Sequence, residues 1–192
     1  ARPTSVVNRT QVLETMRYAL AALAATLFAG TAIAADAPAN QQIELKNSTG
    51  AVVGTATLVS APKGVVMRVE VKGLTPGWHG LHFHEKGDCS KSDFTSAGGH
   101  VHGGPTMVHG LLNPDANEAG DLPNLHVAAD GAGATEVFST FVSLGGVDGR
   151  QDLNDKDGSA IVIHANADDH QTQPIGGAGA RIACGVIPGG AG

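Results

Sequence analysis

The fold class follows from two stretches, Ala51-Val-Val-Gly-Thr-Ala-Thr-Leu-Val59 and Val65-Val-Met-Arg-Val-Glu-Val71. Both are rich in β-branched residues, and their apolar side chains come close to alternating with small or polar ones, as in half-buried strands. The residues between them, Pro62-Lys63-Gly64, favour a tight turn. The two stretches are therefore predicted to pair as a β-hairpin.

The rest of the chain extends this all-β pattern and interrupts it twice. Residues 85–124 and 165–180 are rich in Gly, Pro, His and Asp and lack periodicity, and loops of this length are usually functional. Short strands with many glycines and almost no helical period predict a β-sandwich or flattened barrel. The further expected strands are Leu81–His84, Leu125–Ala128, Ala134–Phe138, Ala160–His164 and Arg181–Ile187.

The N-terminal part has the features of an export signal. Met16-Arg17 precedes an apolar run over 19–29, and small residues follow at Ala32 and Ala34. A positive start, a short apolar core and an Ala-x-Ala site indicate a signal peptide over 16–34, cleaved near Ala34. Residues 1–15 then form an upstream extension, and 35–192 form a single mature domain, periplasmic or secreted. The alternative is a buried helix or an N-terminal anchor.

Charge and hydropathy limit the partners of the mature domain. It carries nine Lys and Arg against 17 Asp and Glu, without a basic stripe, which makes nucleic acid and anionic membranes poor partners. No Cys stands directly after the cleavage site, where a lipoprotein anchor would need one, and no later run is long and apolar enough to span a bilayer. No stable membrane anchor is therefore expected.

The chain contains two cysteines, Cys89 and Cys184. Two cysteines of an exported protein usually pair, because they meet an oxidising compartment. Closing a loop of this length stabilises the fold by about 4–5 kcal/mol in the chain-entropy model. The alternative is a pair of buried free thiols.

Nine histidines raise the question of a metal site, and their spacing is more informative than their number. His82 and His84 lie two apart on an expected strand, so their side chains leave the same face with Cα atoms about 6.5–7 Å apart. Two imidazoles at this separation can converge on one ion, and imidazole suits copper and zinc alike. His164 ends an apolar strand, where a core histidine is the alternative. The long loop adds His100, His102, His109, Glu118 and Asp121.

Five segments in series resemble the copper–zinc superoxide dismutase family, in its bacterial exported form. They follow the order of that family and cover nearly the whole mature chain. The resemblance implies a Greek-key β-barrel and an oxidoreductase that converts two superoxide anions to O₂ and H₂O₂. The segments are Gly73-Leu-Thr-Pro-Gly-Trp-His-Gly-Leu-His-Phe-His-Glu-Lys-Gly-Asp-Cys89, Ser96-Ala-Gly-Gly-His100, the pair His109-Gly-Leu-Leu-Asn-Pro114 and Gly120-Asp-Leu-Pro-Asn-Leu125, Val162-Ile-His-Ala-Asn-Ala-Asp-Asp169, and Gly179-Ala-Arg-Ile-Ala-Cys-Gly-Val-Ile187.

The resemblance implies a copper site with two catalytic residues. Copper would cycle between Cu(II) and Cu(I), while His100 alternates between bridging copper to zinc and carrying a proton. Arg181 would attract the superoxide anion, and a guanidinium suits this task because it stays charged. Cys89 and Cys184 would form the disulfide that joins the ligand-bearing loop to the last strand. The copper ligands would be His82, His84, His100 and His164.

The zinc site departs from the family pattern. The resemblance implies zinc ligands His100, His109 and Asp121, with Asp168 linking ligands of the two metals. The family places a third zinc histidine where this chain has Glu118. Glu118 either binds zinc, as a carboxylate can, or is a solvated loop acid.

Several alternatives follow from this departure. His102 is a second candidate for the missing ligand, whereas His79, His126 and His170 are interpreted as structural or surface residues. The same fold could act as a copper-only dismutase with an incomplete zinc site. A non-catalytic copper-binding protein and a zinc hydrolase are weaker alternatives, since the copper ligands and Arg181 are all present and no general base stands out beside a zinc position. The family includes dimers and monomers, which leaves a homodimer open.

Overall fold

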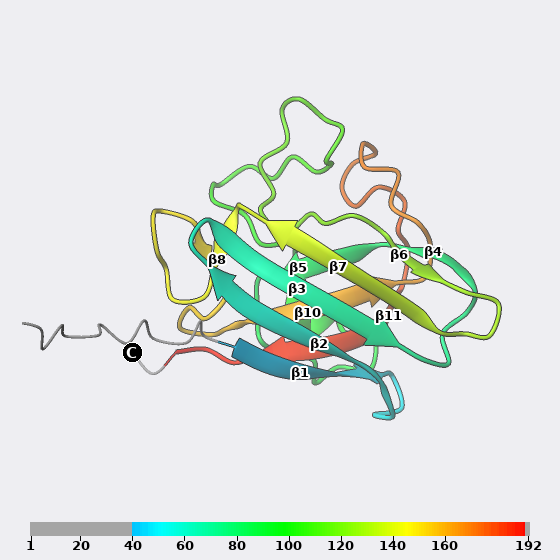
Figure 1. Cartoon of the computed structure of the whole chain (residues 1–192). Coiled ribbons are helices and arrows are strands. Elements are labelled where there is room, and N and C mark those ends of the chain that lie inside the picture. Colours follow the sequence, from blue (N-terminus) through cyan, green and yellow to red (C-terminus); the bar gives the residue numbers. More distant parts are fainter. Residues whose placement is uncertain (1–39, 191–192) are drawn as a thin grey trace, which may run out of the picture. The chain divides into compact units, whose positions relative to one another are not determined.

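The computed structural model describes residues 40–190, and nearly all of their regular structure is β-strand (Figure 1). The predicted signal peptide over 16–34 and the extension over 1–15 lie outside the described residues. Within the described range, no helix has the length and apolar character needed to cross a membrane. The strands are β1 Asn40–Asn47, β2 Val52–Ala61, β3 Gly64–Val71, β4 Gly77–His79, β5 Leu81–His84, β6 Leu125–Val127, β7 Gly133–Ser139, β8 Val142–Ser143, β9 Gln151–Asp152, β10 Ser159–His164 and β11 Arg181–Ile187.

Nine strands form one sheet in the order β4-β6-β7-β3-β2-β1-β11-β10-β5. Its two end strands, β4 and β5, are consecutive in the chain and are separated by Gly80 alone. The chain itself therefore joins the two ends of the sheet, which curves into a nearly closed barrel (Figure 1). The first strand, β1, lies between β2 and β11, so the ends of the domain meet inside the sheet. The predicted all-β barrel is confirmed.

The hairpin predicted from the opening stretches is also confirmed. β2 and β3 pair antiparallel from Gly54↔Val71 to Ala61↔Gly64, which leaves Pro62 and Lys63 as the two turn residues. Gly64 has a φ of +148°, and a Cβ there would lie 2.0 Å from the Ser139 carbonyl oxygen. Only glycine fits this approach between β3 and β7.

Side-chain alternation on β5 separates the core from the site. Leu81 and Phe83 are buried in the main barrel core, while His82 and His84 leave the opposite face. The neighbouring strand β10 is buried along its whole length. Ile161 and Ile163 join the barrel core, and Ala160 and Val162 face a smaller cluster under the disulfide loop.

Some elements of the fold are not predicted by the sequence pattern, namely β1, β4, the short β8 and β9 pair and the 3₁₀ turn Thr95–Ala97. β1 reads Asn-Gln-Gln-Ile-Glu-Leu-Lys-Asn, and only Ile43 and Leu45 in it are buried. Without β-branched side chains at its exposed positions, the segment has little intrinsic strand signal. It is a strand because β2 offers it a long antiparallel partner.

Parts of the two long loops lie on the same side of the barrel, at the top of Figure 1. The first runs from Glu85 to Asn124 and the second from Ala165 to Ala180, as predicted. They contact one another where the Leu112 N–H donates to the His170 carbonyl oxygen at 3.1 Å. This packing places the histidine-rich first loop next to the second loop, which carries Asp168 and His170.

Replacing Leu58 by Ala tests how much the barrel core stabilises the fold. Leu58 is fully buried on β2, and such a truncation costs about 2–5 kcal/mol through lost burial and the cavity left behind. The measurement is denaturant unfolding of the metal-free protein with its disulfide intact. Val52→Ala on the same strand is the matched control, because Val52 is 54% exposed. Equal losses in the two variants would contradict this account of the core.

Candidate metal centre

Four histidines from three parts of the chain converge beside the barrel. His82 and His84 come from β5, His164 from the end of β10, and His100 from the first long loop. Antiparallel pairing of β5 with β10 brings the first three together, with Val162 opposite His82 and Ala160 opposite His84. Each imidazole offers a nitrogen within 4.8 Å of the other three, and all four side chains are at most 2% exposed.

The free nitrogen atoms of this group provide a test for a metal. His82 Nδ1 and the Nε2 atoms of His84, His100 and His164 are buried and have no hydrogen-bond partner. Buried polar atoms are nearly always hydrogen-bonded, and an unpaired one is costly. Four such nitrogens in one cluster therefore fit a bound metal ion. An all-imidazole donor set suits copper.

The opposite ring nitrogens hold these imidazoles in place. His82 Nε2–H donates to Asp168 Oδ2 at 2.8 Å, and His84 Nδ1–H donates to the Gly98 carbonyl at 3.0 Å. His164 Nδ1–H donates to the Gly179 carbonyl at 3.0 Å. An acceptor at one nitrogen fixes the tautomer, so the lone pair lies on the other. Three rings thus present their lone pairs to a common point.

Backbone hydrogen bonds tie the first long loop to β5. The Phe83 N–H donates to the Gly120 carbonyl, and the Val101 N–H donates to the Phe83 carbonyl, both at 2.9 Å. His100 and Asp121 therefore lie next to the two histidines of the strand. A Cβ on Gly120 would lie 2.3 Å from the Phe83 oxygen, so this crossing requires glycine.

A second group shares His100 with the first. His100 Nδ1 lies 2.7 Å from Glu118 Oε2 and 3.0 Å from Asp121 Oδ1. His109 Nδ1 lies 3.1 Å and 2.9 Å from the same two oxygens. Two imidazoles and two carboxylates, within 4.8 Å of one another, form a donor set that zinc accepts. Glu118, only 9% exposed, is thus a member of this cluster rather than a solvated loop acid.

Asp168 connects the two groups with its two carboxylate oxygens. Oδ2 accepts from His82 Nε2–H at 2.8 Å, and Oδ1 accepts from His109 Nε2–H at 3.0 Å. The carboxylate is completely buried between them. One side chain therefore orients a histidine of each group.

The electrostatics of the two groups differ. Burial is the main cause that lowers the pKa of His82 to about 3 and of His164 to about 4, and it holds the pKa of His84 well below its usual value. These rings are therefore neutral, the form that binds metals.

In the second group, paired charges outweigh burial. Burial alone would lower the pKa of His109, but hydrogen bonds to Asp121, Asp168 and Glu118 raise it to about 11. The pKa of His100 is raised for the same reason. Burial would raise the pKa of Asp121, yet its bonds to the two histidines lower that pKa well below the usual range. The second group thus attracts positive charge strongly.

Arg181 lies beside the first group, where carbonyl groups of the loop that carries the disulfide hold it. Its Nη1–H donates to the Phe94 carbonyl and its Nη2–H to the Gly98 carbonyl, both at 2.6 Å. Gly98 also accepts from His84 Nδ1–H, so one carbonyl oxygen orients both the arginine and a ring of the cluster. The guanidinium remains partly exposed.

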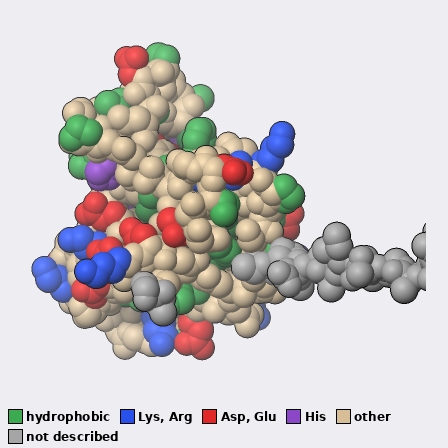
Figure 2. All heavy atoms as spheres, turned by 90° about the vertical axis from the view of Figure 1, so that its left-hand side faces the viewer, with side chains coloured by type: hydrophobic (Ala, Val, Ile, Leu, Met, Phe, Trp, Pro, Cys, Tyr) green, Lys and Arg blue, Asp and Glu red, His purple; other side chains and the backbone are tan. Residues whose placement is uncertain are grey.

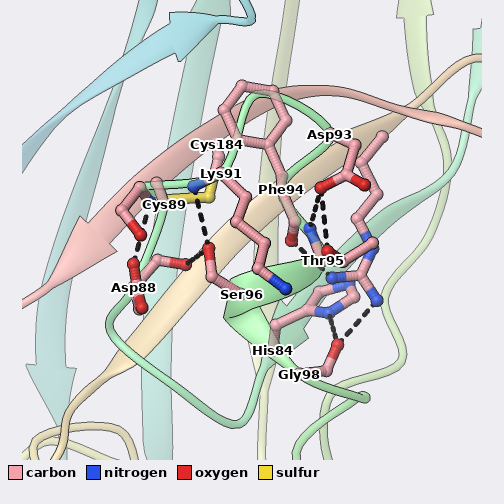
Figure 3. The surroundings of a disulfide bond; sticks show 12 residues. His84, Asp88, Cys89, Lys91, Asp93, Phe94, Thr95, Ser96, Gly98 and Cys184 are labelled. Atoms are coloured by element: carbon pink, nitrogen blue, oxygen red, sulfur yellow. Dashed lines mark hydrogen bonds between the residues drawn. A yellow bond between two sulfur atoms is a disulfide. The ribbon is translucent and has the colours of Figure 1, made fainter.

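The predicted disulfide is confirmed. Cys89 and Cys184 are bonded and connect the first long loop to β11 across 95 residues (Figure 3). Cys184 packs with Phe94, Ala97 and two residues of β10 in the smaller apolar cluster. The bond therefore anchors the segment that supplies the carbonyl groups to Arg181.

The other histidines lie outside both groups. His102 Nδ1 lies 2.7 Å from the Gly104 oxygen, and its Nε2 lies 3.5 Å from a Glu85 carboxylate oxygen, so the alternative of His102 as the missing ligand has no geometric support. His79 faces the carbonyls of Thr75 and His164 at 2.7 Å each. His126 is exposed and packs on Trp78.

The histidines of the site could be predicted from the sequence, but the groups that hydrogen-bond to the site residues could not. Gly98 and Gly179 act through backbone carbonyls, which every residue carries, so no residue type marks them. Asn124 lies in the segment Gly120–Leu125, but nothing in the sequence indicates its role. Its side-chain amide bonds both the N–H and the carbonyl of the Asp168 backbone. On the face in Figure 2, acidic and basic side chains are interspersed and little histidine surface is visible, in keeping with a buried centre.

Comparison with known proteins agrees with this geometry. The family model described as copper/zinc superoxide dismutase matches residues 52–187. A Caulobacter vibrioides protein named superoxide dismutase [Cu-Zn] is 63% identical over 143 residues, which cover 74% of this chain and 82% of that protein. The chain therefore belongs to the copper/zinc superoxide dismutase family.

Two further relatives support this assignment. Superoxide dismutase [Cu-Zn] 2 of Aquifex aeolicus is 41% identical over 146 residues, covering 75% of this chain and 84% of that protein. The crystal structure of a superoxide-dismutase-like protein from Bacillus subtilis aligns with a TM-score of 0.71 at 38% identity. That alignment covers 78% of this chain and 99% of the Bacillus chain.

Proposed function

We propose that the protein is a copper- and zinc-containing superoxide dismutase, which converts two superoxide anions to O₂ and H₂O₂. The observation that carries this proposal is the set of four buried imidazole nitrogens without partners, next to a second group that shares His100. The names of the relatives point to the same activity. Bound copper would supply the one-electron redox chemistry, and bound zinc, which has none, would shape the site.

The metal assignments follow the two groups. His82, His84, His100 and His164 would hold copper, and His100, His109, Glu118 and Asp121 would hold zinc. His100 belongs to both because its two ring nitrogens face different groups. Asp168 would keep the rings of His82 and His109 aligned, since its two oxygens accept from both.

The catalytic roles fall to Arg181 and His100. Arg181 places a fixed positive charge at the edge of the copper group, which favours the approach of a small anion. His100 would carry a proton on Nε2 whenever that atom does not bind copper, and it would pass this proton to the reduced substrate. The other three ligand rings are less suited to this role, because burial lowers the pKa of each below its usual value, whereas the carboxylates beside His100 raise its pKa.

The setting is proposed to be outside the cytoplasm, in the periplasm or secreted. The disulfide supports this location, because such bonds persist in oxidising compartments. The signal peptide over 16–34, the cleavage near Ala34 and the mature domain over 35–192 remain predictions from the sequence. A homodimer also remains a prediction.

Metal analysis combined with an activity assay tests the function. The purified mature protein should bind one copper and one zinc per chain and remove superoxide in a stopped-flow assay. A copper-loaded protein without turnover would contradict the proposed activity. Full activity with one copper and no zinc would instead identify a copper-only dismutase.

Replacing Glu118 by Ala tests the unusual zinc ligand. Zinc affinity, measured by competition with a chelator, should fall more than about 100-fold, because loss of an outer partner of a ligand already costs about 10–100-fold. Asp115→Ala is the control, since it removes an exposed acid from the same loop. Unchanged zinc affinity in the Glu118 variant would exclude this residue as a ligand.

Replacing Arg181 by Gln tests electrostatic attraction of the substrate. The second-order rate should fall about tenfold or more, and its dependence on ionic strength should weaken, because a charge beside the copper group is removed. Lys63→Gln removes an equal charge from the exposed β2–β3 turn and should change neither quantity. Equal rates in the two variants would rule out a steering role for Arg181.

A further inference from the structure

One buried nitrogen without a partner lies outside the copper group. His170 Nδ1, in the second long loop, has no hydrogen-bond partner within the described part of the chain. The nearest carboxylate oxygen is Asp168 Oδ2 at 3.4 Å. The His170 side chain is 19% exposed, whereas the Asp168 carboxylate is completely buried. The sequence had suggested a surface or structural residue at this position.

The amide of Asn124 determines which nitrogen of His170 carries the proton. Asn124 Nδ2–H donates to the Asp168 carbonyl at 2.8 Å, while Asn124 Oδ1 accepts from the Asp168 backbone N–H at 2.9 Å. These two bonds fix the orientation of the amide. Its nitrogen then faces His170 Nε2 at 3.2 Å as a donor. His170 Nε2 is therefore the acceptor, and a neutral ring carries its proton on Nδ1.

The backbone and the ring of His170 each lie near one oxygen of the Asp168 carboxylate. The backbone N–H donates to Oδ1 at 2.6 Å, and Nδ1 lies 3.4 Å from Oδ2, close enough for an electrostatic contact but not a hydrogen bond in this structure. Oδ1 also accepts from His109, and Oδ2 from His82. His170 therefore lies against both oxygens of the carboxylate that links the two metal groups.

His170 is itself fixed by contacts with the first long loop. Its carbonyl oxygen accepts from the Leu112 N–H at 3.1 Å, and a Cβ on Gly110 would lie 2.2 Å from the same oxygen. Its φ is +62°, a conformation that a histidine rarely adopts. The neighbouring contacts therefore hold His170 in a backbone conformation that a histidine would not adopt by its own preference.

We propose that His170 is a positioning residue, which holds the Asp168 carboxylate so that it can orient His82 for copper and His109 for zinc. This inference rests on the metal assignments proposed above. It goes beyond them because it gives the ring of His170, and not only its backbone, a role in metal binding.

The experiment compares His170→Gly with His170→Asn. Both residues accept a positive φ and both keep the backbone N–H, but only Asn offers a donor near the position of Nδ1. His170→Gly should lose zinc affinity about tenfold to 100-fold in chelator competition and should shift the electron paramagnetic resonance spectrum of bound copper. His170→Asn should stay within about threefold of the parent protein, well below the loss expected for His170→Gly.

The outcomes distinguish a role of the His170 side chain from a role of the backbone turn at this position. Parent-like zinc affinity and an unchanged copper spectrum in His170→Gly would overturn the proposal, because the turn alone would then suffice. Equal losses in the Gly and Asn variants would also overturn it, since the donor would not matter. If His170→Gly does not fold, His170→Gln takes its place, with its amide nearer the position of Nε2. If zinc affinity falls in His170→Gln but is retained in His170→Asn, the proposed role is supported. If both variants retain the zinc affinity of the parent, the role is contradicted.

The parent protein separates this inference from the proposed function. If the parent protein binds copper and zinc, and the His170 variants keep the same zinc affinity and copper spectrum, only the role of His170 is overturned. A parent that binds neither metal overturns both proposals.

Discussion

Buried polar atoms need partners, and the four unpartnered imidazole nitrogens beside the barrel are the feature on which the rest of the site depends. Everything around them fits this requirement. The opposite nitrogens of His82, His84 and His164 are satisfied by Asp168, Gly98 and Gly179, which sets the tautomers and turns the lone pairs inward. Unpaired buried nitrogens are costly, and a metal that binds them removes this cost. The removal of the cost contributes to the affinity of the site for the metal.

The barrel provides the rigidity that this arrangement needs. β5 buries Leu81 and Phe83 in the core, so His82 and His84 must leave its other face. β10 lies beside it and is buried on both faces, which places His164 at the end of a firmly packed strand. Loops deliver the remaining groups, but backbone hydrogen bonds to Phe83 and a disulfide hold these loops against the strands. The site is therefore positioned by strands even where loops carry its residues.

The sequence allowed the prediction of the fold class, the hairpin, the disulfide and the histidines of the copper group, because these follow from periodicity and from family motifs. The strand β1 was not predicted, since its polar residues carry little strand signal without the pairing with β2. The position of Glu118 also needed the structure. A loop acid and a buried ligand have the same sequence, and only the fold of the loop brings Glu118 Oε2 to 3.1 Å from His109 Nδ1. His170 was underestimated for a related reason, since its partners Asn124 and Asp168 lie in two different loops.

The separation of the copper ligands along the chain has a consequence for the order of assembly. His82 and His164 meet only once β5 pairs with β10, which brings together segments about 80 residues apart in the sequence. An unfolded chain therefore offers at most the local pair His82 and His84. The full binding energy becomes available after the long-range pairing, so metal binding reinforces the finished barrel rather than guiding its formation.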